Sequence, residues 1–149
     1  DRLRSRGLGD VYKRQVEKRV IFTLSKQELW KKAVPFMRSP IRWVYYTDDD
    51  LPDNLMISGI NALSHYSHLN PEERRTVAIL DRDFKDMMSE GLKVDDMEGK
   101  HCIEVWIYHP RMFPDTEYVD KLSLYLSLRH DTDARVEGEL EYVIKTIKW

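Results

Sequence analysis

Residues 101–109, HCIEVWIYH, carry apolar side chains on both alternating sets of positions. Successive side chains of an extended strand point to opposite faces of a sheet. Apolar residues on both faces are typical of a strand that is covered on both sides, so this stretch predicts a central strand. The rest of the chain must therefore supply strands beside this one and elements that cover both of its faces.

The rest of the chain supplies short strands and helices in alternation. Apolar and β-branched runs predict further strands at 18–24, 39–47 and 75–80. Helical spacing of apolar residues predicts helices at 25–37, 56–70, 81–91, 118–130 and 131–149. This order indicates an α+β fold, a small and mainly antiparallel sheet with packed helices. We expect the last two helices to cover one face of the sheet.

Local signals predict several helix boundaries. Ser25 followed by Glu28 forms a capping-box pattern at a helix start. Pro35 lacks a backbone N–H, so it is expected to stop or kink that helix between residues 34 and 37. Ser58 is a candidate cap for the helix at 56–70.

The first fifteen residues have a different origin from the rest, on our interpretation. SRGLGDVYKRQ, residues 5–15, resembles the translation of a transposase sequencing adapter, whose mosaic end AGATGTGTATAAGAGACAG reads as residues 10–15. We therefore expect genuine sequence to begin near Val16, with a segment missing before it, and residues 1–15 to form no part of the native fold. The alternative is a basic arm that grips phosphate.

Charge and cysteine content narrow the class of protein. The formal net charge is -2, but residues 1–15 hold five basic and two acidic residues, which leaves -5 for the rest. This balance argues against nucleic acid as the chief partner of residues 16–149. The single cysteine, Cys102, fits a reducing cytoplasm. No apolar run approaches the ~20 residues of a membrane span, so we expect no membrane partner.

Two groups of motifs carry a resemblance to known regulators. VIFTLSKQELWKKA, residues 20–33, resembles the second wing strand and following helix of a MarR-type winged helix-turn-helix domain. SGINALSHYSHL (58–69) with RTVAIL (75–80) resembles the element that follows the winged helix in abortive-infection-type (type IV) antitoxins. IEVWIYHP (103–110) and VDKLSLYLSL (119–128) are similar to the C-terminal half of such proteins.

The resemblance implies a domain plan and partners. Residues 16–38 would be a remnant of the winged helix, and residues 39–149 a C-terminal α+β interaction domain. The missing half would anchor DNA, while this part would bind a second copy or a cognate toxin protein. Lys18 and Arg19, near the wing tip, are the residues placed to touch a DNA phosphate.

Aromatic residues are the candidates for the partner surface, because Trp and Tyr are favoured anchors at interfaces. The candidates are Trp43, Tyr45, Trp106 and Tyr108. Packing in the core is the alternative explanation for all four.

A second hypothesis is a small metal-dependent hydrolase or nuclease, for which the chain offers candidate metal ligands and acidic residues. His65 and His68 have the spacing of a metal pair on one helix, with His101, Cys102 and His109 as possible further ligands. Asp95, Asp96 and Glu104 resemble a nuclease acid cluster, but Trp106 stands where such nucleases usually have lysine.

The competing explanations for these residues are structural. Asp48–Asp50 fit a solvated turn, Glu104 a satisfied strand carboxylate, and Cys102, which faces away from His101, a buried structural thiol. We therefore expect no catalytic residue, cofactor or metal. A third hypothesis is an autonomous nucleic-acid-binding module.

Overall fold

A computed structural model of the protein describes residues 25–149. The chain divides into two units, Asp1–Met37 with Lys148–Trp149, and Arg38–Ile147. The predicted strand at 18–24, with Lys18 and Arg19, lies outside the described residues, as does the adapter-like stretch.

The described part of the first unit holds helix α2, Lys26–Ala33, and the 3-10 turn η1, Val34–Phe36. The predicted capping box is confirmed: Ser25 Oγ accepts the Glu28 N–H at 3.1 Å, and Glu28 Oε2 accepts the Ser25 N–H at 3.3 Å. The helix also ends where Pro35 predicts, because a proline offers no N–H to continue the helical hydrogen bonds.

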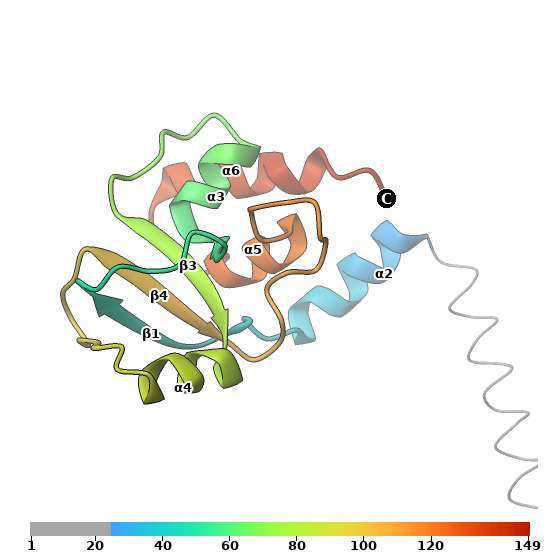
Figure 1. Cartoon of the computed structure of the whole chain (residues 1–149). Helices are drawn as coiled ribbons and strands as arrows, with labels where there is room; N and C mark the ends of the chain where they lie inside the picture. Colours follow the sequence, from blue (N-terminus) through green and yellow to red (C-terminus); the bar gives the residue numbers. More distant parts are fainter. Residues whose placement is uncertain (1–24) are drawn as a thin grey trace, which may run out of the picture. The chain divides into compact units, whose positions relative to one another are not determined.

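The second unit is built on one four-stranded sheet in the order β1-β4-β3-β2 (Figure 1). β1 pairs with β4 and β2 with β3 in antiparallel fashion, whereas β3 and β4 are parallel. The predicted α+β class with a mainly antiparallel sheet is confirmed, and β4 is the expected central strand. The strands span Ile41–Thr47 (β1), Met56–Ile57 (β2), Arg75–Leu80 (β3) and His101–Trp106 (β4).

Helices cover both faces of this sheet. Three helices, α3, α5 and α6, lie over one face, and α4 lies over the other (Figure 1). The expected cover by the last two helices is therefore confirmed, with α3 added to the same layer. The helices span Gly59–Tyr66 (α3), Asp81–Ser89 (α4), Lys121–Leu128 (α5) and Ala134–Lys145 (α6).

Each face of β4 belongs to its own hydrophobic core. Trp106 is fully buried in the larger core, beneath α3, α5 and α6. Ile103 and Val105 are buried in the smaller core with Phe84 of α4. Burial on both faces is what the sequence of β4 predicts, since its alternate positions are all apolar apart from His101 and Glu104.

The helix predicted at 56–70 is wrong at its start. Met56 and Ile57 form β2, and the helix begins only at Gly59. Met56 pairs with Ala78, and the Ile57 backbone bonds the Glu117 carbonyl and the Val119 N–H. These pairings with distant segments override the local helical pattern, and Gly59, at φ 64°, makes the turn between strand and helix.

Two glycines should respond in opposite ways to an added methyl group. A Cβ on Gly99 would lie 2.5 Å from the Thr47 backbone nitrogen, whereas one on Gly138 in α6 would meet nothing within 4 Å. We expect Gly99→Ala to lower the free energy of unfolding by about 1–3 kcal/mol, as overpacking does. Gly138→Ala should raise it by about 0.5–1 kcal/mol through helix propensity. Urea unfolding measures both, and changes of the same sign would contradict the close approach at Gly99.

Candidate functional site

The four aromatic candidates for a partner surface do not lie together. Tyr45 and Trp43 pair with residues of β4 that face α4, and the Tyr45 ring stacks on Phe84 at 5.2 Å. Trp106 is completely buried on the opposite face, where Tyr108 packs against it at 5.6 Å. Among the four, only Trp43 is exposed, at 54%.

Both edges of the sheet are partly covered. On the β1 edge, Tyr46 exchanges two backbone hydrogen bonds with Asp95, at 2.8 and 2.7 Å, and the register shifts between Ile41 and Trp43. On the β2 edge, Ile57 bonds the segment that leads into α5. Covering segments and register shifts of this kind disfavour the pairing of an edge strand with a further strand. A partner strand is therefore not the contact that this sheet favours.

The two histidines of the alternative metal hypothesis have different neighbours. The His65 ring stacks on Tyr118 at 3.8 Å with its plane almost parallel. His68 is exposed, and its Nδ1 lies 3.8 Å from Glu139 Oε2. Within residues 25–149, no three His, Cys, Asp or Glu side chains come together as metal ligands would.

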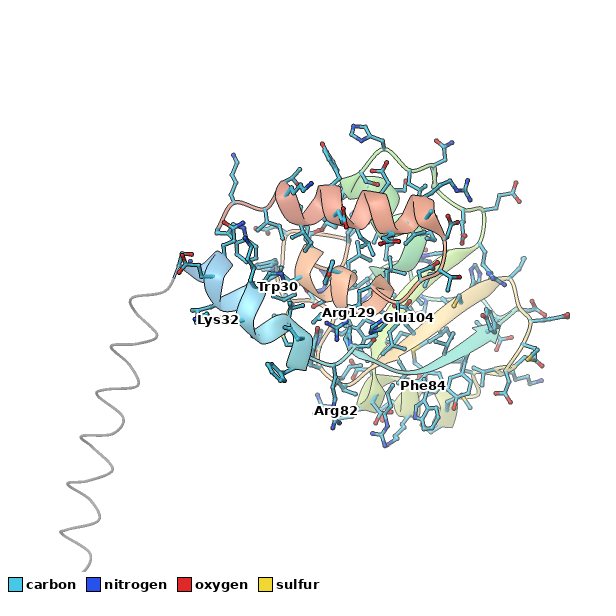
Figure 2. All side chains as sticks on the ribbon, turned by 180° about the vertical axis from the view of Figure 1, so that it is seen from behind. Trp30, Lys32, Arg82, Phe84, Glu104 and Arg129 are labelled. Carbon is cyan, nitrogen blue, oxygen red and sulfur yellow. The ribbon has the colours of Figure 1, made fainter. Side chains whose placement is uncertain are left out.

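Glu104 is held as a satisfied strand carboxylate, as the structural explanation predicts. Its Oε1 accepts the Ser58 hydroxyl at 2.5 Å and the Trp106 indole N–H at 3.1 Å. Burial raises the pKa of the Glu104 carboxyl, and these two hydrogen bonds oppose that rise. Figure 2 shows Glu104 on β4 inside the unit, with Phe84 on the other side of the sheet. Ser58 is the expected cap of α3, but its side chain makes no cap hydrogen bond. Its hydroxyl donates to Glu104 instead.

The remaining acids and the cysteine also have structural roles. Asp48 and Asp49 accept the backbone N–H groups of Lys100 and Lys93, and Asp95 accepts two N–H groups of its own loop, which lower its pKa. Cys102 is buried, as predicted, and burial raises the pKa of its thiol. These contacts hold a loop against β1 and place the thiol in the core.

Residues of the 58–69 and 119–128 segments meet in space. Tyr66, at the end of α3, donates its hydroxyl to the Val119 carbonyl at 3.0 Å, and His65 stacks on Tyr118. The Lys121 ammonium lies 5.4 Å from the centre of the Tyr66 ring, a cation–π contact. Segments some fifty residues apart in sequence therefore build one wall.

This wall borders a hollow of about 370 Å³, called here the α3–α5 groove. Met112 and Phe113 line it from a loop and are 57% and 61% exposed. Adjacent exposed apolar side chains at a hollow make this the candidate binding surface of the unit. The groove is lined by Tyr66, Met112, Phe113, Asp120, Lys121, Leu122 and Ile147.

The loop that carries Met112 and Phe113 is fastened by Arg111. The Arg111 guanidinium donates to the Thr116 carbonyl at 3.2 Å and to the Asn54 carbonyl at 2.9 Å. At the other end of the groove, Asp120 caps α5 by accepting the Ser123 N–H at 2.9 Å. These contacts fix the loop after β4 and the start of α5, so both parts of the groove lining are already ordered in this structure.

Sequence reasoning missed Met112 and Phe113 as candidates. The available signal was the apolar pair itself, flanked by Pro110 and Pro114 in a polar loop. Leu122 and Ile147 carried no such signal, because their helical spacing is equally typical of a core.

Comparison with protein-family models, with curated proteins and with solved structures finds no match to this chain. Within the part of the chain that the structure describes, no helix has the length and apolar character needed to cross a bilayer.

Proposed function

We propose that residues 38–147 are the interaction domain of a cytoplasmic winged-helix regulator or antitoxin, and that the α3–α5 groove binds its protein partner. The observation that carries this proposal is the exposure of Met112 and Phe113 at a hollow built by the two antitoxin-like motifs. DNA anchoring belongs to the winged-helix part of such a protein. The domain described here supplies the contact with the partner.

The groove favours a different protein over a second copy of this chain. A two-fold dimer brings the same patch of both subunits together. Two hollows facing each other would leave a void, and voids in an interface forfeit packing energy. A convex apolar segment from another surface fills the hollow. Lys121 at the rim would pair with a carboxylate that flanks this segment.

Phe113→Ala should weaken the complex with the partner by roughly 2 kcal/mol, about 30-fold in Kd, the size of an aromatic hot spot. The partner to test is the protein encoded by the neighbouring reading frame, co-expressed and purified with the full chain. Isothermal titration calorimetry gives both dissociation constants. Met97→Ala is the matched control, because Met97 is 78% exposed and does not line the groove.

Equal affinity of the Phe113→Ala and Met97→Ala variants would remove the groove from the interface. A concentration-dependent dimer of this chain alone, abolished by Phe113→Ala, would assign the groove to a second copy. The neighbouring protein failing to bind the unaltered chain would count against the regulator or antitoxin role itself.

A further inference from the structure

A second cavity lies at the edge of the sheet where β3 and β4 both end. The two strands are parallel, so the chain leaves both at the same edge (Figure 1). In open α/β sheets ligands bind outside the carboxyl ends of the parallel strands, and the parallel pair of this sheet offers the same kind of edge. The segment after β3 is the first turn of α4, and the segment after β4 carries His109 and Arg111.

The cavity, called here the β3–β4 pocket, has a volume of about 300 Å³. That volume is at the lower end of the range for small-molecule sites. Its apolar lining includes Leu55, Ile79 and Met87, and its charged lining is Asp83 and Arg111. The pocket therefore combines an apolar floor with groups of both charge signs.

Asp83 and Arg111 do not form an ion pair with each other. Arg111 directs its hydrogen bonds to the carbonyls of Thr116 and Asn54, which orient the guanidinium, and it forms no ion pair with a carboxylate of residues 25–149. Among residues 25–149, Asp83 makes neither an ion pair nor a side-chain hydrogen bond. A ligand with a single charge would satisfy one of these groups and be repelled by the other.

His109 adds a donor on the Arg111 side of the pocket. Its Nδ1 accepts the Arg111 backbone N–H at 3.1 Å, so the neutral ring carries its proton on Nε2. The imidazole N–H and the remaining guanidinium N–H groups suit a carboxylate, which accepts several hydrogen bonds. Asp83 suits an ammonium group.

We propose that the β3–β4 pocket binds a small zwitterion with an apolar side chain, the chemistry of a free apolar α-amino acid. The carboxylate lies against Arg111 and His109, the ammonium against Asp83, and the side chain over Leu55, Ile79 and Met87. The β3–β4 pocket shares no lining residue with the α3–α5 groove, and its proposed ligand does not depend on the proposed partner protein.

The test uses three probes of one shape on the full ¹⁵N-labelled chain, followed by amide chemical shifts. They are L-leucine, 4-methylpentanoate, which lacks the ammonium, and 3-methylbutylamine, which lacks the carboxylate. We expect saturable shifts at the pocket with L-leucine and at least about tenfold weaker binding of the other two, since each loses a charge-assisted hydrogen bond. Absence of saturable shifts with L-leucine overturns the proposal.

Variants separate the two charged contacts. Asp83→Asn should weaken L-leucine binding about tenfold, because only the amino acid has an ammonium group. Binding of 4-methylpentanoate should not weaken and should tighten, since the variant removes the repulsion between two carboxylates. Asp86→Asn is the control, on the same helix but outside the pocket lining. Arg111→Gln should weaken the binding of both L-leucine and 4-methylpentanoate, because both carry a carboxylate. Thermal unfolding checks that the loop of this variant still folds. Equal effects of Asp83→Asn and Asp86→Asn on L-leucine would overturn the assignment of Asp83.

Discussion

Trp106→Ala is expected to lower the free energy of unfolding by about 3–5 kcal/mol, the usual cost of removing a fully buried aromatic side chain. Trp106 has no exposed surface and lies in the core beneath α3, α5 and α6. Its indole N–H also donates to the buried Glu104, so truncation leaves a cavity and removes a hydrogen bond from a buried carboxyl. Because whole domains are stable by only about 5–15 kcal/mol, the variant should lose a large share of its stability.

Urea unfolding of two further variants makes this prediction specific. Trp43→Ala, on the neighbouring strand and 54% exposed, should cost less than about 1 kcal/mol. Trp106→Phe keeps part of the ring system but loses the N–H, which leaves Ser58 as the remaining donor to Glu104. The lost hydrogen bond and the smaller side chain should together cost about 1–3 kcal/mol. Similar losses for Trp43→Ala and Trp106→Ala would contradict the burial of Trp106.

The same pair of tryptophans marks what the sequence could and could not predict. Alternation over 101–109 was enough to predict a central strand, because burial on both faces leaves a local pattern. It did not separate Trp106, a core residue, from Trp43, an exposed one, since both stand in apolar strands. Exposure depends on which helices cover each face, and that is decided by contacts between distant segments.

The α3–α5 groove could not be predicted from local sequence patterns for a related reason. Its lining comes from α3, the loop after β4, the start of α5 and the residues that follow α6. The loop is held by Arg111 through backbone carbonyls of Asn54 and Thr116, and any residue could supply a carbonyl. Strand β2 was missed similarly, because its two residues become a strand only by pairing with β3.

Stability should fall as pH rises above the ordinary range of glutamate, because of Glu104. Burial raises the pKa of the folded-state carboxyl above its unfolded value. The folded protein then holds a proton that the unfolded chain has released, so the contribution is fully present below the unfolded pKa and is lost as pH rises through the folded pKa. Between those two values the free energy of unfolding falls by up to about 1.4 kcal/mol per pH unit.

Glu104→Gln isolates this dependence, because the amide keeps an acceptor for Ser58 and Trp106 but cannot ionise. We expect the stability of Glu104→Gln relative to the unaltered protein to rise with pH, starting near pH ~4.3, the ordinary value for glutamate. Urea unfolding from pH 4 to 8 measures the difference, with the exposed Glu141→Gln as control. Asp95 and Asp133 have lowered pKa values and so act in the opposite sense, but they are unaltered in both proteins and cancel in the difference. A stability difference between the two proteins that does not change with pH would contradict this prediction. It would mean that Glu104 ionises as easily in the folded protein as in the unfolded chain, whereas burial beneath α3, α5 and α6 should disfavour the charged carboxylate.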